Sequence, residues 1–337
     1  MTAAPAGTTL PAGPAVSVVI VSRGRPEALR RCLTGIAQLQ YEPFEVIVVA
    51  DPAGIARAGS LAFSDSLKMV TFDEANIARA RNLGIVQAAG EIVAFIDDDA
   101  VPEPYWLHHL LAPAQDQSVA AFTGFVRGRN GISFQYRARQ LDSQGEAMPL
   151  EVDPEAPTVL PAPDAGAIKT EGTNMAFRRE VLVALGGFDP AFHYFLDETD
   201  LNMRLARAGL ATAIAPLAEV HHGFAANALR AANRVPRDLF DIGASWAVFH
   251  RKHLPEAARA SHWHELRAAE RARLLRTWCR AGWSRGISPG CCGVLMRATP
   301  KASHGPSARW FCLATPKRRF APFRPSPGKA RCFPAAR

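Results

Sequence analysis

The amino-acid sequence predicts an α/β protein, with a mostly parallel sheet flanked by helices. Short β-branched runs alternate with helically spaced apolar residues over the first hundred positions, which is the pattern of such sheets. The composition agrees, because 337 residues that are 48% hydrophobic and 21% charged can bury a full core. Collagen, coiled coil and disulfide-stabilised mini-protein are thereby excluded.

The first strand and the first helix are predicted between residues 16 and 39. Val16 to Val21 form a β-branched run that is typical of a strand buried on both faces. Pro26 suits the first turn of a helix, and apolar residues follow it at helical spacing: Leu29, Cys32, Leu33, Ile36 and Leu39. This helix is therefore expected to pack one face on the sheet.

Polar residues follow the next predicted strands. We expect strands at 44–50, 67–72 and 91–96, with a helix at 77–89 before the last of them. In open parallel sheets, ligands bind at the carboxyl ends of the strands. We therefore expect one polar crevice lined by the residues at those ends: Ser22, Arg23, Asp51 and the triplet Asp97-Asp98-Asp99.

The elements after residue 100 follow a less regular pattern. Helices are expected around 106–111 and at 180–185 and 199–208, and strands at 119–126, 173–178 and 211–220. Residues 127–169 are rich in Gly, Pro and charge and are predicted to be variable and partly looped. A helical segment then follows, with one apolar face made of Leu239, Ile242, Trp246, Phe249 and His253.

The end of the chain differs in charge from the rest. Residues 271–337 hold 15 Lys and Arg and no Asp or Glu, so the net charge of +8 leaves −7 for residues 1–270. Cys32 is the only cysteine before residue 279 and cannot make a disulfide framework, so we expect a reducing cytoplasm. The other five cysteines lack the paired spacing of a zinc site. Export and membrane insertion are not expected, because no basic leader and no run of about 18 apolar residues are present.

Residues 285–337 are predicted to form a disordered basic tail. Its aromatic residues, among them Phe320 and Phe323, would suit peripheral contact with the anionic inner face of a membrane. Contact with nucleic acid would be non-specific. The abrupt loss of acidic residues also fits a change of reading frame, and these interpretations of the tail stay open.

Three successive carboxylates after a buried strand require a compensating charge. A divalent ion such as Mg²⁺ or Mn²⁺ is the simplest, since it prefers oxygen ligands and usually keeps one or two carboxylates. Alternation along an extended segment sends Asp97 and Asp99 to one side and Asp98 to the other. The pattern Asp97-x-Asp99-x-Val101 also matches haloacid-dehalogenase-like phosphatases, but the downstream Lys and second acidic motif of those enzymes are not found.

Further stretches accompany the triplet in a specific order. They are Asn76-x-x-x-x-Arg81-Asn82-x-Gly84 before it, then Glu171-Gly172-Thr173-Asn174, Gly186-Gly187-Phe188-Asp189 and Asp197-Glu198-Thr199-Asp200-Leu201-x-x-Arg204. Over residues 16–225 the combination resembles family 2 inverting glycosyltransferases with the GT-A fold. The resemblance implies metal-dependent transfer of a sugar from a nucleoside diphosphate to an acceptor hydroxyl, in cell-surface polysaccharide or glycolipid synthesis.

The resemblance also implies a metal site. The triplet would be the DxD motif of the family, with Asp99 as the direct metal ligand and Asp97 and Asp98 on the donor. His221 would complete the site, and His222 is the adjacent alternative. The expected cofactor is Mg²⁺ or Mn²⁺.

The donor pocket follows from the same resemblance. Arg81 would contact the base or the phosphates, and Ser22, Arg23 and Asp51 would line the pocket for base and ribose. The family usually has two acidic residues after its second strand, and Ala50 stands at the first of these positions. A UDP-sugar is favoured, and the departure at Ala50 leaves the identity of the base open.

The resemblance places the general base of the reaction at Glu198. The family more often has Glu then Asp at this point, so Asp197 is the second candidate. Gly172 and Asn174 are candidate residues on the side of the glycan or lipid-linked acceptor. Asp200 is a third, although it stands four residues before Arg204, which is also the spacing of a simple helical ion pair.

The expected organisation has four parts. They are a flexible lead (1–15), a glycosyltransferase domain (16–225), a helical extension (226–284) and the tail (285–337), and the domain divides into a nucleotide-sugar half (16–127) and an acceptor half (128–225). Two other functions stay open. One is a non-catalytic sugar-nucleotide-binding protein of the same fold, and the other is a Mg²⁺-dependent phosphatase or nucleotidyltransferase.

Overall fold

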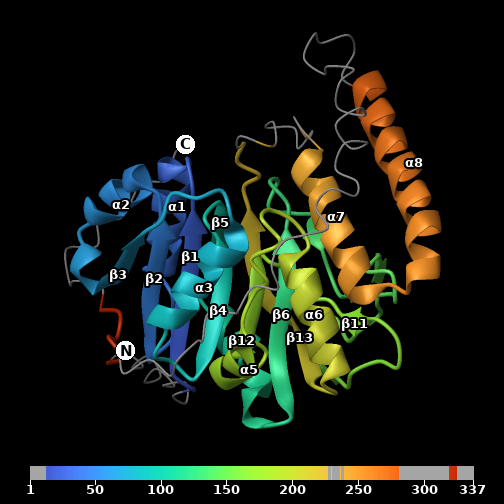
Figure 1. Ribbon diagram of the computed structural model, residues 1–337. Coiled ribbons are helices and arrows are strands. Elements are labelled where there is room, and N and C mark those ends of the chain that lie inside the picture. The colour runs from blue at the N-terminus through green and yellow to red at the C-terminus, as the bar shows by residue number, and fades with distance from the viewer. Residues whose placement is uncertain (1–12, 227–228, 230–235, 237–238, 281–318, 325–337) are drawn as a thin grey trace.

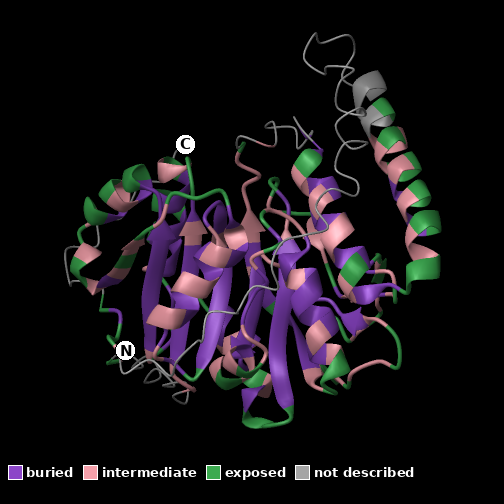
Figure 2. Ribbon diagram, in the orientation of Figure 1, coloured by how far each residue is buried: buried purple, intermediate pink, exposed green. Residues whose placement is uncertain are grey.

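The computed structural model describes residues 13–226, 229, 236, 239–280 and 319–324. In this part of the chain, ten strands form one mixed sheet in the order β10-β13-β6-β12-β4-β1-β2-β3, with β5 paired to β13 and β7 to β6. Helices cover both faces of the sheet (Figure 1), and the strands form the buried interior (Figure 2). The predicted α/β fold is confirmed.

Four parallel strands form one side of the sheet: β1 (Val16–Ser22), β2 (Phe44–Ala50), β3 (Leu67–Thr71) and β4 (Ile92–Asp97). Strand β1 lies between β2 and β4, with Ser22 opposite Ala50 and Val21 opposite Asp97. All seven residues of β2 are buried, as expected for a β-branched strand that is covered on both faces. Because these strands end at the same height in the sheet, the polar residues at their carboxyl ends lie along one edge of it.

Two helical layers cover this sheet. Helices α1 (Pro26–Ile36), α2 (Pro52–Gly59) and α4 (Trp106–Leu110) pack on one face, and α3 (Ile77–Gln87), α5 (Arg179–Ala184) and α6 (Asp197–Arg207) pack on the other. Helix α2 was not predicted. Its eight residues are mostly Ala and Gly, so it lacks an apolar stripe that would reveal it in the sequence.

The remaining strands of the large sheet come from later in the chain. They are β5 (Ala100–Pro102), β6 (Val119–Arg127), β7 (Phe134–Tyr136), β10 (Thr158–Leu160), β12 (Asn174–Arg178) and β13 (Ala211–His222). Strand β12 runs antiparallel between β4 and β6, so the two halves of the chain share one sheet. Trp106 is fully buried beneath it and donates its indole N–H to Asn174 Oδ1 at 2.8 Å, which makes Trp106 a core residue.

The region predicted as variable is more ordered than expected. Strands β8 (Arg139–Leu141), β9 (Ala147–Pro149) and β11 (Ala167–Ile168) pair into a small separate sheet. None of these strands is longer than three residues, so each is too short to show a periodic pattern in the sequence.

The predicted helical extension is present as α7 (Phe240–His253) and α8 (Glu256–Arg280). The expected apolar face of α7 packs on the region around α6, with Ile242, Trp246 and Phe249 in one cluster with Phe192 and Met203. Helix α8 runs along the outer side of α7 (Figure 1). Among the described residues, no helix combines the length and the apolar composition that crossing a membrane requires.

One piece of the basic tail packs on the body. Residues 319–324 lie beside the β2–β3 edge of the sheet (red in Figure 1), where the Phe323 side chain is 3% exposed between Phe44 and Phe63. The Phe323 N–H also donates to the Phe44 carbonyl at 2.7 Å. The expectation that Phe323 is a free surface aromatic is therefore wrong, because it gains apolar burial. The rest of the expected lead and tail, residues 1–12, 285–318 and 325–337, lies outside the described residues.

Candidate active site

A cavity of about 570 Å³ opens where β4 ends and α6 begins. Its lining comes from three parts of the chain. The first 127 residues contribute Arg25, Ile77, Arg81, Asp97 and Asp99; residues 128–225 contribute Tyr136, Arg139, Glu146, Lys169, Glu171, Gly172, Thr173, Tyr194, Phe195, Asp197, Glu198 and His222, among others; helices α7 and α8 contribute Ile242, Trp246, Glu270 and Arg273.

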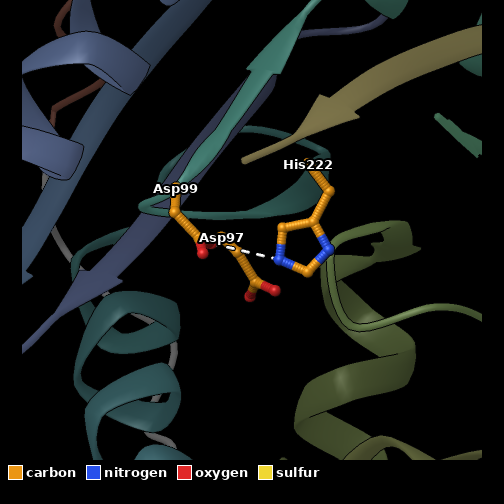
Figure 3. Close-up of side chains that lie close together, drawn as sticks. All are labelled: Asp97, Asp99 and His222. Carbon is orange, nitrogen blue, oxygen red and sulfur yellow. Dashed lines mark ion pairs between the residues drawn. The ribbon is translucent and has the colours of Figure 1, made fainter. Parts of the chain in front are cut away.

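Two carboxylates and a histidine at one end of the cavity form a group that can hold a metal ion. Asp97, Asp99 and His222 each offer a ligand atom within 4.8 Å of the others (Figure 3). Asp99 Oδ1 is buried without a hydrogen-bond partner among the described residues, and His222 Nε2 lies 3.2 Å from it. Burial acts to raise the pKa of Asp99, but His222 and Arg25 lower it to about 2, so the carboxylate stays ionised. Carboxylate and imidazole donors of this kind fit Mn²⁺ or Mg²⁺.

The structure corrects the choice of histidine. Successive side chains alternate along β13, so His221 and His222 point in opposite directions. His221 Nε2 lies 2.6 Å from Glu103 Oε1 and does not line the cavity. The adjacent alternative, His222, is the histidine that reaches the acidic residues. Sequence reasoning could not choose between neighbours, because the choice depends on which face of β13 meets the end of β4.

Arg25 is a site residue that the sequence did not reveal. Its guanidinium lies over two acids of the triplet, with Nε 3.1 Å from Asp98 Oδ2 and Nη1 3.3 Å from Asp99 Oδ2. It also lines the cavity. The only signal was its place in the short loop between the first strand and the first helix, between Gly24 and Pro26.

Asp98 points away from the cavity, as the expected alternation requires. It is fully buried and accepts a hydrogen bond of 2.6 Å from the Ser22 hydroxyl. Burial raises the pKa of Asp98 to about 7 in spite of the positive charge of Arg25. Neither Asp98 nor Ser22 lines the cavity. The two residues hold Arg25 through Asp98, and their contact with a donor stays a prediction.

Asp51 and Arg23 also lie outside the lining of this cavity. The Asp51 carboxylate caps α2 by accepting from the Gly54 N–H at 2.8 Å, and its other oxygen accepts from the Gly24 N–H at 2.8 Å. Gly24 has a φ of +68°, a left-handed conformation that favours glycine. Arg23 is exposed and pairs with Asp73 at 2.8 Å. Asp51 thus holds the loop that carries Arg25, and a role of either residue in binding a base stays a prediction.

Arg81 connects the two acidic groups of the site. Its guanidinium pairs with Asp197 Oδ2 at the start of α6, and its Nη2 lies 3.7 Å from Asp97 Oδ1. The same Nη2 donates to the Gly172 carbonyl at 3.2 Å. A Cβ at Gly172 would stand 3.0 Å from this nitrogen, so glycine there leaves room for the guanidinium. Arg81 and Gly172 both line the cavity, as expected.

The two carboxylates that begin α6 have different cationic partners. Asp197 pairs with Arg81, whereas Glu198 Oε1 accepts a hydrogen bond of 2.9 Å from Lys169 Nζ. Burial raises the pKa of Asp197 above its ordinary range, against the charge of Arg81. Burial acts in the same direction on Glu198, but Lys169 and Arg81 hold the pKa of Glu198 well below its ordinary range. The cations around Glu198 therefore favour its ionised form.

Two of the predicted acceptor-side residues serve the core instead. The Asn174 amide is fully buried and donates to the carbonyls of Phe125 at 3.0 Å and Ala218 at 2.7 Å. Asp200 is also fully buried, and its oxygens are bound by side chains of α6 and α7: Arg204 at 2.8 Å, Lys252 at 2.6 Å and His253 at 2.8 Å. Neither side chain lines the cavity, so their acceptor-side role stays a prediction that the geometry does not support, whereas the helical ion pair of Asp200 with Arg204 is confirmed.

The far wall of the cavity was not predicted. It is built by Phe195, Trp246 and Ile242 together with the charged side chains of Glu270 and Arg273. Beside them the Arg139 guanidinium lies 4.2 Å from the ring centre of Tyr136. These residues carry no motif, and only the packing of α7 on α6 brings them to the acids.

Comparison with known proteins agrees with this geometry. The sequence model of the family described as "Glycosyltransferase like family 2" matches residues 14–238, and the chain belongs to this family. The chain is 28% identical over 250 residues to the O-antigen biosynthesis protein RfbC of Myxococcus xanthus, across 70% of this chain and 19% of that protein. It is 27% identical over 223 residues to the pre-mycofactocin glycosyltransferase of Mycobacterium tuberculosis, across 63% of this chain and 44% of that protein.

The chain thus spans less than half the length of either relative. Among solved structures, that of GalNAc-T7 with UDP, GalNAc and Mn²⁺ superposes with a TM-score of 0.50 at 17% identity, over 62% of this chain and 44% of that chain. At this identity the likeness shows a shared fold, which is that of GT-A glycosyltransferases. Helices α7 and α8 lie outside the residues that the family model matches.

Proposed function

We propose that this protein is a metal-dependent inverting glycosyltransferase that moves a sugar from a nucleoside diphosphate to an acceptor hydroxyl. The observation that carries the proposal is one cavity with a metal-ligand group at one end and, on its wall, the partly buried Glu198 carboxylate, which Lys169 Nζ contacts at 2.9 Å. Family membership supports transfer chemistry. The two groups together match what a direct displacement at the anomeric carbon requires.

Two arginines and a group of potential metal ligands lie at the donor end of the cavity. A divalent ion held by Asp97, Asp99 and His222 would offset the negative charge that develops on the departing diphosphate. Arg25 and Arg81 line the same end and supply further positive charge there. A separate acid to protonate the leaving group is therefore not needed.

Glu198 would act on the acceptor side. As an ionised carboxylate in the cavity wall, it can take the proton of the attacking hydroxyl, a task that is typically worth about 10²–10⁴ in rate. The attack forms the new glycosidic bond while the bond between the anomeric carbon and the phosphate oxygen breaks, so the configuration inverts. The aromatic and apolar wall around Phe195 and Trp246 would receive the acceptor.

The donor, the acceptor and the site of action are proposed more broadly. A UDP-sugar is favoured, which the solved relative with UDP supports. A glycan or lipid-linked acceptor is supported by the relative named for O-antigen biosynthesis. An acceptor of that kind would place the protein in the cytoplasm, in peripheral contact with the inner face of the membrane.

Calorimetric titration of the protein with UDP-, GDP-, TDP- and CMP-sugars, with and without Mn²⁺, tests the proposal. We expect micromolar binding of one donor that depends on Mn²⁺ and is lost in Asp99→Ala. Transfer is then measured with a panel of glycan and lipid-linked acceptors, and the anomeric configuration of the product is read by NMR. Donor binding without any transfer would instead support a non-catalytic sugar-nucleotide-binding protein, and phosphate or pyrophosphate release without donor specificity would support a phosphatase or nucleotidyltransferase.

A further inference from the structure

We propose that Lys169 is a positioning residue that holds Glu198 ionised and oriented as the base, so that Glu198 and not Asp197 takes the acceptor proton. This inference rests on the proposed function and deepens it. Neither the motifs of the sequence nor the match to the family assigns a role to Lys169. Its geometry does so through three observations: the contact with Glu198, the rigid backbone under it, and the separate partner of Asp197.

The contact between Lys169 and Glu198 is short and partly buried. Lys169 Nζ lies 2.9 Å from Glu198 Oε1 and 3.1 Å from Thr199 Oγ1, and the whole residue is 6% exposed. The ammonium is therefore anchored at two successive residues in the first turn of α6. A lysine with two anchors in a cavity wall has little freedom to move away, so Glu198 is held in one orientation.

The backbone of Lys169 is held just as firmly. Lys169 follows β11, which pairs with β8, and its N–H donates to the Arg139 carbonyl at 3.0 Å. The Arg139 side chain in turn makes a bidentate ion pair with Glu171, at 2.8 and 2.7 Å. The small sheet of β8, β9 and β11 thus places Lys169 beside the start of α6. This placement gives the sheet a function in the site.

Asp197 is engaged elsewhere. Arg81 pairs with its carboxylate and also approaches Asp97 at the metal end, so Asp197 orients an arginine toward the donor. The charged groups that face Glu198 are Lys169 after β11, Arg81 on α3 and the neighbouring Asp197 on α6. The two adjacent carboxylates therefore have different roles: Asp197 acts on the donor side through Arg81, and Glu198 acts on the acceptor.

The division fits the balance of the reaction. The proton leaves the acceptor hydroxyl and joins the Glu198 carboxylate, while the electron pair of the breaking bond departs with the nucleoside diphosphate. A buried carboxylate without a cation nearby would take up a proton before the acceptor arrives, because burial disfavours the charged form. Lys169 opposes this uptake and keeps Glu198 available as a base at neutral pH.

Carbon-13 NMR of protein labelled at the glutamate carboxyl carbon tests the inference without requiring turnover. The Glu198 signal is assigned from its loss in Glu198→Gln. In the wild type we expect it to keep the ionised shift from pH 8 down to pH 5. In Lys169→Met we expect it to titrate at least one pH unit higher than in the wild type, and Lys169→Arg should restore the ionised shift.

Lys68→Met is a matched control, because Lys68 also pairs with a buried glutamate, Glu45 at 2.8 Å, on the other half of the sheet. It should leave the Glu198 signal unchanged. Circular dichroism and thermal melting establish that each variant is folded. If Lys169→Met folds and its Glu198 signal titrates as in the wild type, the inference is overturned.

The pH profile of transfer gives a second readout once a donor and an acceptor are found. In Lys169→Met we expect the acidic limb of kcat to move to higher pH, with at least about a tenfold loss at pH 6 and little change in the KM of the donor. Lys169→Arg should recover most of the rate. An equal loss at every pH would overturn the inference, whereas failure of the wild type to bind any donor would overturn the proposed function and leave the NMR titration as the test of Lys169.

Discussion

The two halves of the molecule differ in how their helices are joined to the rest of the fold, although both contain apolar clusters. In residues 16–127, strands β1 to β4 meet their helices through apolar side chains such as Val18, Leu33 and Phe95, in two large clusters. In residues 128–280, buried polar groups make many of the decisive contacts. Asp200 binds Lys252 and His253 of α7, and His250 of α7 lies 2.9 Å from His262 of α8.

This difference has a functional consequence. Apolar packing is not directional and grows with the area that is buried, so the first half forms a rigid base for the donor end. Buried ion pairs and histidine contacts are directional and depend on protonation. The cavity wall on α7 and α8 is therefore positioned by a small number of polar contacts in addition to the apolar cluster around Trp246. Changes to these polar contacts should affect residues 128–280 more than residues 16–127.

The largest expected effect is a loss of catalytic rate on substitution of Glu198, at the start of α6. Glu198→Gln should lower kcat by about 10²–10⁴, because it removes the base but keeps the shape of the side chain. Donor affinity, which depends on the other end of the cavity, should stay unchanged by calorimetry. Glu180→Gln on the exposed surface of α5 is the control and should keep full activity. Full activity of the Glu198 variant would instead favour Asp197 as the base.

The contact between α6 and α7 should have the next largest effect. Asp200→Ala should lower the free energy of unfolding by about 3–5 kcal/mol, since it removes the buried carboxylate that Arg204, Lys252 and His253 share. Urea denaturation measures this loss. Hydrogen exchange should show that α7 loses protection before β1 and β2 do. Equal loss of protection in both halves would contradict the comparison.

At the donor end, neighbouring histidines provide a matched pair. His222→Ala should weaken Mn²⁺ binding by about 10–100-fold, because a ligand is lost. His221→Ala should leave Mn²⁺ affinity unchanged, since His221 faces Glu103. Titration of each variant with Mn²⁺ by electron paramagnetic resonance measures both constants. The opposite ranking would show that the metal group is wrongly placed.

The smallest expected effect is a pH dependence of stability in residues 128–280. Burial lowers the pKa of His250 to about 4, below its value of about 6.5 in an unfolded chain. The unfolded state therefore binds the proton first, and stability that is present above pH 6.5 is lost as the pH falls toward 4. The loss should be of the order of 1 kcal/mol at pH 5, and His250→Gln should flatten it. Urea titrations at pH 5 and pH 7 provide the measurement.

Much of the first half could be predicted because its signals are local. The bounds of β2 were predicted to the residue, since Phe44 and Asp51 mark the two ends of a run that is apolar except for Glu45. Helix α2 was missed because small residues give no periodic stripe. Strands β8, β9 and β11 were missed because two or three residues carry no period, although their pairing is what brings Lys169 to Glu198.

The sequence by itself determined the fold class, the family resemblance, and the choice of Asp97, Asp99, Arg81 and Glu198 as candidate residues, which line one cavity. These follow from residue types and spacings along the chain, which local structure preserves. Only the tertiary structure decided that His222 and not His221 lies with Asp97 and Asp99, that Arg25 and Lys169 line the same cavity, and that the side chains of Asn174 and Asp200 are buried in the core. Each of these depends on which faces of distant elements meet, and packing of the whole chain selects that contact.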